Sequence, residues 1–359
     1  MKREEEKPSG SSHPSAAFFI VQYVMKQKLL QYLACPSCGG RIQLLTIAQS
    51  DADGEIISGD LQCSTCARRT AIMRGVPRFA DLDQVESDKA ATAENFGWSW
   101  QHFAQDDERY AEQFLGWIAP VKQEFFNNKI VLEAGCGKGR HTKLAARWGA
   151  REVIGVDLSA AVEVAFAATR HLPNAHIVQA DIYHLPFPRL FDYAFSVGVL
   201  HHLPDPRAGF ASLAAKVKPR GYLSAWVYGE ENNQWITRWI NPLRERLTSR
   251  LNKRALLHLS KVPTAALYLA TKLVYGPLNR TAEGAALARY LFYNDYLNAI
   301  SAFDWREQHS IVFDHLVAPT AFYHSRAEFE SWWRDIKAAD VVIGWHNKNS
   351  WRGWGRIEN

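Results

Sequence analysis

Between residues 129 and 228, short apolar runs alternate with longer segments in which apolar positions recur every three or four residues. The short runs are typical of strands buried on both faces, and the longer segments of amphipathic helices. The pattern predicts strands near 129–133, 153–157, 176–179, 192–197 and 222–228, and helices near 140–148, 160–170 and 207–217. Because strands that alternate with helices indicate a doubly wound sheet, we expect an α/β, Rossmann-like core.

The segment before this core, residues 83–128, begins as a polar linker and continues with a helical pattern. The pattern starts at residues 94–103 and runs through Phe114 to Phe126. Such a helix either packs on the sheet or forms a cap over a ligand. We expect a mixture of both, with Phe96 and Trp100 facing a pocket.

Residues 230–310 interrupt the order expected between the fifth strand and the last helix, so we interpret them as a mostly helical insertion. Lys and Arg outnumber Asp and Glu there, and leucines lie between the basic positions. This composition is typical of an amphipathic lid with a solvated basic face. The alternatives are a membrane-surface helix or a site for an anionic substrate such as RNA, a nucleotide-sugar or a phospholipid.

The chain returns to the core at residues 311–359. A Ser cap precedes an amphipathic helix over 328–336, and residues 341–343 and 351–357 predict a closing antiparallel hairpin. Just before that helix, titratable side chains are concentrated where the lid rejoins the core. Either they face a substrate or they hydrogen-bond the loop; they are Asp314, His315, Tyr323 and His324.

Composition limits the compartment and the partners. The net charge of +5 is modest and does not by itself indicate a nucleic-acid partner. No uncharged apolar stretch is long enough to cross a membrane. Residues 1–27 begin with acidic as well as basic side chains and predict a disordered leader rather than a signal peptide. We therefore expect a cytoplasmic protein, with membrane-surface contact as an open alternative.

Glycines at alternate positions follow the first predicted strand: Gly135, Gly137 and Gly139 come directly after Glu133-Ala134. A backbone without Cβ lets a ligand lie against the turn, and the next strand ends in Asp157, where an acid would meet ribose hydroxyls. Two ligands fit, a dinucleotide or S-adenosylmethionine. A carboxylate beside the loop repels a pyrophosphate but suits a sulfonium and an ammonium, so the charge pattern favours S-adenosylmethionine.

Five ordered segments between 129 and 228 resemble the motifs of class I S-adenosylmethionine-dependent methyltransferases. They are Val-Leu-Glu-Ala-Gly-Cys-Gly-Lys-Gly139, Val-Ile-Gly-Val-Asp-Leu-Ser159, Gln-Ala-Asp-Ile-Tyr-His-Leu-Pro-Phe187, the run 191–202, and Val-Lys-Pro-Arg-Gly-Tyr222. The resemblance implies a cofactor site in which Glu133 to Gly139 surround the methionine portion and Asp157 binds the ribose. It also implies that Leu158, Asp181 and Ile182 contact the adenine and that Ser196 faces the methionine end.

His201 and His202 follow the fourth predicted strand. One interpretation is that they cap this strand and pack on the cofactor loop. The other makes His201 a general base that removes a proton from the acceptor, which an imidazole pKa near neutrality would permit.

Four of the five cysteines form two C-x2-C pairs, Cys35 with Cys38 and Cys63 with Cys66. This spacing predicts a structural Zn²⁺ site with four thiolates and no open position, in a zinc ribbon over residues 28–82. Two disulfides are the competing interpretation, disfavoured because no export signal is evident. The ribbon resembles the small activator subunit of tRNA and translation-factor methyltransferases, fused here to its enzyme.

We therefore expect a methyltransferase in which alignment of the acceptor with the reactive methyl group supplies most of the catalysis. The first hypothesis is transfer to an O, N or C atom of a small molecule of natural-product, lipid or sugar type. The second is a methyltransferase or binding protein for a macromolecule, tRNA or protein, docked through the ribbon and the basic insertion.

Overall fold

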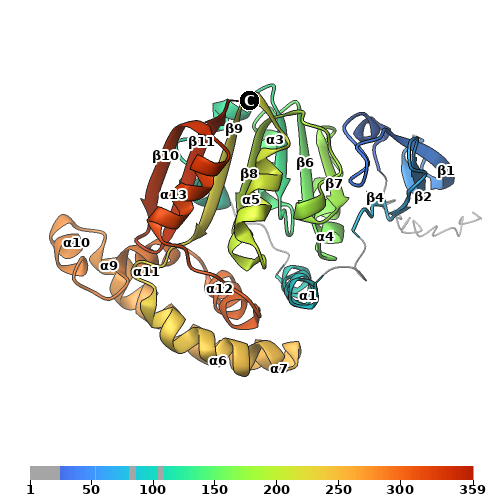
Figure 1. Cartoon of the computed structure of the whole chain (residues 1–359). Helices are drawn as coiled ribbons and strands as arrows, with labels where there is room; N and C mark the ends of the chain where they lie inside the picture. The colour runs from blue at the N-terminus through green and yellow to red at the C-terminus, as the bar shows by residue number, and fades with distance from the viewer. Residues whose placement is uncertain (1–24, 53, 81–85, 104–108, 359) are drawn as a thin grey trace, which may run out of the picture.

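A computed structural model describes residues 25–52, 54–80, 86–103 and 109–358 (Figure 1). Two sheets organise this part of the chain, one with four strands and one with seven. The leader predicted over residues 1–27 lies almost entirely outside the described residues, which begin at Met25. The backbone of Met25 already pairs with that of Ile56 in the ribbon.

The seven-stranded sheet has the order β10-β11-β9-β8-β5-β6-β7. Strands β5 to β9 are parallel, while β11 runs antiparallel to β9 and β10 antiparallel to β11. The bounds are β5 Ile130–Ala134, β6 Glu152–Asp157, β7 Ala175–Gln179, β8 Phe191–Val197, β9 Val217–Tyr228, β10 Ala338–His346 and β11 Ser350–Ile357. The predicted Rossmann-like sheet and its closing hairpin are confirmed.

Helices cover both faces of this sheet. Within β5, Ile130 and Leu132 belong to one apolar cluster and Val131 to another, because successive side chains in a strand point to opposite faces. The cluster around Leu132 includes residues of α5 and α13, whereas Val131 packs with α2 and α3. The bounds are α2 Tyr110–Ile118, α3 Arg140–Arg147, α4 Val162–Thr169, α5 Pro206–Ala214 and α13 Arg326–Asp335.

The helix starts follow local capping chemistry. The Asp205 side chain accepts a hydrogen bond from the Ala208 N–H at the start of α5, and Pro206 occupies the first turn. The Ser325 side chain accepts in the same way from the Glu328 N–H, as the predicted cap requires. The starts of α5 and α13 are therefore set by residues next to each helix rather than by distant contacts.

The ribbon is built from η1 and four strands, and it packs beside β7 (Figure 1). Its bounds are η1 Gln27–Gln31, β1 Ile42–Ser50, β2 Ile56–Cys63, β3 Arg69–Met73 and β4 Val76–Pro77. Leu29, Ile56 and Leu61 of the ribbon belong to the same buried cluster as Leu132 of the sheet. The Phe79 N–H also donates to the Gln179 carbonyl oxygen at 2.8 Å, so the two units share one core.

Helix α1, Ser87–His102, begins inside the stretch expected as a linker and packs against α12, Trp305–Val317. Helix α12 crosses the boundary at residue 310 that the sequence predicted between insertion and core. The insertion itself is helical, as predicted, and lies below the sheet in Figure 1. Its remaining elements are η6 Ile236–Ile240, α6 Asn241–Arg246, η7 Thr248–Arg250, α7 Lys253–Leu259, α8 Lys261–Ala270, η8 Thr271–Tyr275, α9 Gly276–Leu278, α10 Ala282–Ala288 and α11 Asn294–Ile300.

Candidate active site

A cavity opens at the carboxyl ends of β5, β6, β7 and β8, and α1 closes it from the other side. Open α/β sheets bind their ligands at this edge. Five of the predicted cofactor residues line the cavity: Gly135, Gly137, Asp157, Leu158 and Ile182. Phe96 and Trp100 of α1 line it as well, so the two side chains expected to face a pocket do so.

The glycine turn depends on positive φ and on close packing. Gly135 has φ 80°, and a Cβ there would lie 2.1 Å from a methyl group of Val199. Gly137 has φ 50° and lies against the indole of Trp100. Any side chain at Gly135 would therefore clash and strain the backbone, which explains the residue type.

Asp157 stands at the centre of this edge. Its Oδ2 accepts a hydrogen bond from the Gly137 N–H at 2.8 Å, and its Oδ1 accepts from the N–H and the hydroxyl of Ser159 at 2.8 and 2.7 Å. These donors fix the carboxylate between the first and second βα turns. The arrangement presents a fixed negative group to the cavity, as recognition of vicinal hydroxyls requires.

Glu133, Gly139 and Ser196 lie behind the cavity and do not line it. Glu133 shares its face of β5 with Val131, so its buried carboxyl accepts a hydrogen bond from Thr142 and lies 3.1 Å from Nδ1 of His141. Burial raises the pKa of Glu133 to about 8. Gly139 is the N-cap of α3, and the Ser196 hydroxyl donates to the Ala134 carbonyl oxygen. Direct cofactor contact by these three residues stays a prediction.

Asp181 does not itself line the cavity, but it pairs with a residue that does and that sequence analysis did not predict. The carboxylate forms an ion pair with Lys89, and Lys89 lines the cavity. Desolvation lowers the pKa of Lys89, against the opposing effect of Asp181. Lys89 is on α1, whose position over the sheet no local sequence signal specifies.

A second cavity of about 510 Å³ continues from the first. Phe96, Trp100, Arg140, Val197, Gly198 and His202 line both, so a ligand in one can meet a ligand in the other. The second cavity is walled by aromatic side chains of α2, of β9 and of the insertion, including Trp117, Trp226, Tyr228, Tyr293 and Tyr296. The predicted lid thus contributes directly to an enclosed space beside the cofactor cavity.

Titratable groups line the second cavity. Asp314 is there, as are His315 and Tyr323, whereas His324 is not and pairs with Glu328 at 2.8 Å. The Ser99 hydroxyl donates to Asp314 at 2.7 Å, but burial still raises the pKa of Asp314 to about 7. Burial lowers the pKa of His315 to about 4. Near neutral pH Asp314 is the group in this set poised to exchange a proton.

His201 and His202 occupy different environments. The ring of His201 is fully buried, stacks on Tyr228 with centroids 3.8 Å apart, and lines neither cavity. Desolvation holds the pKa of His201 well below its usual range. His202 lines both cavities, and its Nδ1 lies 2.6 Å from the Thr320 carbonyl oxygen. The geometry does not favour His201 as the predicted base, because its ring lines neither cavity.

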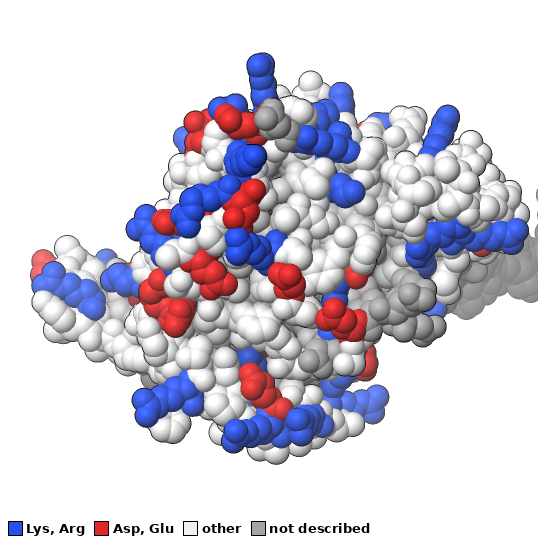
Figure 2. Space-filling model, in the orientation of Figure 1, with Lys and Arg blue, Asp and Glu red and all other residues white. Residues whose placement is uncertain are grey.

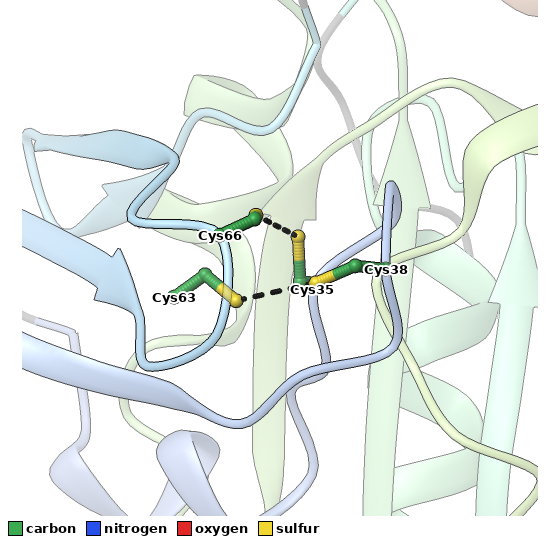
Figure 3. Close-up of side chains that lie close together, drawn as sticks. All are labelled: Cys35, Cys38, Cys63 and Cys66. Atoms are coloured by element: carbon green, nitrogen blue, oxygen red, sulfur yellow. Dashed lines mark hydrogen bonds between the residues drawn. The ribbon is translucent and has the colours of Figure 1, made fainter.

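The four paired cysteines converge at one point of the ribbon (Figure 3). Their Sγ atoms all lie within 4.8 Å of one another, with Cys35 to Cys66 at 3.6 Å and Cys38 to Cys63 at 3.5 Å. These separations are far longer than a disulfide bond and match thiolates about 2.3 Å from a shared Zn²⁺. The donor set therefore fits the predicted metal site better than it fits two disulfides.

The fold and the first cavity define an α/β domain with a cavity at the carboxyl edge of its parallel strands. Comparison with known families makes the class specific, because residues 132–225 match the model described as "Methyltransferase domain". The core of this chain is a methyltransferase domain, and the resemblance to class I S-adenosylmethionine-dependent enzymes is confirmed.

Relatives match about a third of this chain. The tRNA U34 carboxymethyltransferase of Pseudoalteromonas translucida is 33% identical over 127 residues, 34% of this chain and 38% of the relative. An uncharacterised protein of a Synechococcus species is 38% identical over 107 residues, 28% of this chain and 25% of the relative. The chain thus spans well under half the length of these relatives. The solved magnesium protoporphyrin IX methyltransferase of Synechocystis has 12% identity and a TM-score of 0.43, covering 75% of this chain and 97% of the other.

Proposed function

We propose that this protein transfers the methyl group of S-adenosylmethionine to an acceptor held in the second cavity. The observation that carries the proposal is the continuity of the two cavities, one bearing Asp157 and the glycine turn and the other enclosed by the insertion. The cofactor supplies an already reactive methyl group. The chain's own residues then have to bind, orient and exclude water.

Four residues would carry most of this work. Asp157 would accept hydrogen bonds from the ribose hydroxyls, while Phe96 and Trp100 would cover the cofactor and separate it from solvent. Asp314 would accept a proton from an acceptor hydroxyl or amine, because its carboxylate faces the second cavity with a pKa of about 7. We propose Asp314 in this role in preference to His201, which lines neither cavity.

For the acceptor, relatives that are tRNA U34 carboxymethyltransferases favour a macromolecule over the small molecule that we expected first. A tRNA base turned into the aromatic-walled second cavity would be such a macromolecular acceptor, since bases stack on aromatic side chains. The ribbon offers exposed basic residues for the phosphates, namely Arg41, Arg68 and Arg69. A small-molecule acceptor is the second candidate, and the enclosed volume of about 510 Å³ supports it.

We also propose that Cys35, Cys38, Cys63 and Cys66 hold a structural Zn²⁺ and that the protein works in the cytoplasm. Reduced thiolates and a cytosolic cofactor support that compartment. Among the described residues, no helix combines the length and apolarity needed to cross a bilayer.

The reaction can be tested with methyl-labelled S-adenosylmethionine and three fractions of one cell extract: total RNA, protein freed of RNA, and small molecules. Label in RNA that ribonuclease releases would support the tRNA acceptor. Label in the small-molecule fraction alone would support the second candidate. Absence of label from all three, together with tight NAD binding in calorimetry, would show that the domain is not used for methyl transfer.

A further inference from the structure

Exposed apolar side chains are concentrated in the insertion. Twelve of the eighteen large apolar side chains that are exposed in the described part of the chain lie between residues 239 and 305. Single exposed apolar residues are ordinary on protein surfaces, but a concentration of them marks a contact surface. The arrangement of these side chains on their helices indicates what kind of partner they contact.

The helical run from α7 through α8 to η8 exposes a row of aliphatic side chains to solvent. Its solvent side carries Leu259, Val262, Leu269 and Leu273, which are 58%, 74%, 56% and 69% exposed. With the exposed Ala266 these positions follow one another at spacings of three and four, so they form a single stripe. We call this set of five residues the aliphatic stripe.

The opposite side of the same run is buried, with leucines on α7 and with hydroxyl groups from Ser260 onward. Ser260, Thr264 and Thr271 are each at most 1% exposed. The Thr264 hydroxyl donates to the Ser260 carbonyl oxygen at 2.7 Å, and the Thr271 hydroxyl donates to Gln308 of α12 at 3.1 Å. This part of the helix therefore satisfies its hydroxyls inside the protein, while the aliphatic stripe faces solvent.

The surroundings of the stripe are strongly basic. Between residues 238 and 280 there are nine Lys and Arg and one acidic residue, Glu245. Arg246, Arg250, Arg254 and Lys261 are exposed. Lys and Arg side chains gather along the lower edge of the molecule in Figure 2, where Figure 1 shows α6 and α7. A second apolar set on η6 and α6, spaced four residues apart, consists of Trp239, Leu243 and Leu247.

Three kinds of partner can be compared on charge and chemistry. RNA would use the basic residues but leave the aliphatic stripe in water, because phosphates and sugars offer no apolar surface. A second copy of the chain across a two-fold axis would bring basic residues against basic residues. An anionic lipid surface satisfies both features, since acyl chains accept Leu and Val while headgroups attract Lys and Arg.

We infer that the insertion docks the protein on an anionic membrane surface, with the aliphatic stripe buried at the headgroup boundary and the flanking basic residues on the headgroups. The inference goes beyond the proposed reaction and does not depend on it. The insertion also walls the second cavity through Tyr293 and Tyr296, so docking would place the acceptor site next to the bilayer.

Flotation of the full chain with vesicles tests the inference. One set contains phosphatidylcholine alone, and the other phosphatidylcholine with phosphatidylglycerol. We expect flotation with the anionic set only. The double variant Val262→Asp with Leu269→Asp should lose about tenfold in partitioning for each side chain. Arg250→Glu with Arg254→Glu should lose at least about fivefold per residue.

The matched control is Leu45→Asp with Ile47→Asp, two exposed apolar residues of β1 in the ribbon, which should float like the unaltered protein. Unchanged circular dichroism of all variants excludes misfolding as the cause of any loss. Lack of flotation with both vesicle sets would overturn the inference, as would equal loss in the control. So would tRNA binding that requires Val262 and Leu269, or a dimer in solution that Val262→Asp dissociates.

Discussion

Asp157 is the side chain on which the proposed cofactor recognition depends most. Its carboxylate is held by the Gly137 N–H and by Ser159, so it is oriented before any ligand arrives. Hydrogen bonds to a charged acceptor contribute about 1.5–3 kcal/mol each. A pre-oriented carboxylate facing a ribose therefore has a measurable and specific effect on binding.

Replacing Asp157 by Asn should weaken binding of S-adenosylmethionine roughly 10- to 100-fold, because the amide is uncharged and donates where the hydroxyls also donate. Isothermal calorimetry measures the change. Asp335→Asn is the control, since this carboxylate pairs with Arg207 on the surface, far from the cavity lining. Equal affinities of the Asp157 variant and the control would contradict the assignment.

Asp314 should control how activity depends on pH. Its pKa of about 7 means that the proton-accepting carboxylate form appears as the pH rises through neutrality. We expect kcat to be half-maximal near pH 7 and to level off above it, and Asp314→Asn to lower kcat about 100-fold and remove this dependence. His201→Ala, made in parallel, should keep the pH profile. If His201→Ala removed the pH dependence and Asp314→Asn kept it, His201 would be the base instead.

Glu133 should make the protein without cofactor less stable as the pH rises. Its pKa is about 8 in the folded state and near 4.5 when unfolded, so the unfolded chain releases this proton first. The free energy of unfolding that depends on Glu133 is complete below about pH 4.5 and is lost as the pH rises from there to about 8. Urea unfolding of Glu133→Gln between pH 5 and 8 should show a smaller decline than the unaltered protein. Parallel declines would mean that the carboxyl ionises normally.

Among single residues, sequence predicted those of the loops better than those of the strands. Gly135 and Gly137 follow β5 and Asp157 is the last residue of β6, where the chain must turn toward the ligand edge, and all three line the cavity. Glu133 belongs to β5 itself, and strand alternation turns it toward α3. Lys89 had no sequence signal, because its place in the site depends on where α1 lies over the strand ends. His202 was predicted only to cap its strand and pack on the cofactor loop, and it lines both cavities.

The ribbon is the element whose fold depends on a bound ion. Four thiolates would close a tetrahedral site, yet the ribbon also shares its apolar residues with the sheet. Loss of the metal should therefore affect more than the ribbon. It should expose part of the cluster that contains Leu132.

Cys63→Ser should abolish zinc binding and unfold the ribbon, because apparent binding free energies of about 10–16 kcal/mol stabilise comparable small zinc sites. Atomic absorption should show one zinc per chain before the change and none after it. Thermal melting should fall for the sheet as well, by several degrees. Cys136→Ala is the control for metal content, since Cys136 lies in the glycine turn and outside the cluster. Full zinc content in the Cys63 variant would contradict the site.

At the level of the whole molecule, ribbon and core are joined by a second kind of contact. Glu163 of α4 pairs with two arginines of the ribbon, Arg78 at 3.2 Å and Arg74 at 2.5 Å. The Arg78 side chain is 13% exposed and also donates to Gln179, whereas the Arg74 side chain is 69% exposed. The same carboxylate thus offers a buried pair and a surface pair for comparison.

Arg78→Ala should lower the free energy of unfolding by about 1–3 kcal/mol and increase hydrogen exchange of ribbon amides, because buried polar partners lose their hydrogen bonds. Arg74→Ala should change it by less than about 1 kcal/mol, since exposed ion pairs contribute little. Urea unfolding and exchange measurements check both. Equal effects would show that the ribbon is held by its apolar contacts alone.

The amino-acid sequence by itself determined the sheet, its helices, the glycine turn and the cysteine pairs, because these depend on periodicity and spacing within short segments. The two cavities, the ion pair of Lys89 with Asp181, and the turning of Glu133 and His201 away from the ligand were decided by the tertiary structure. So was the reversed polarity of α8, whose buried hydroxyls find partners only on α12 and in their own turn. Such features depend on which distant segments meet, and no local pattern carries that information.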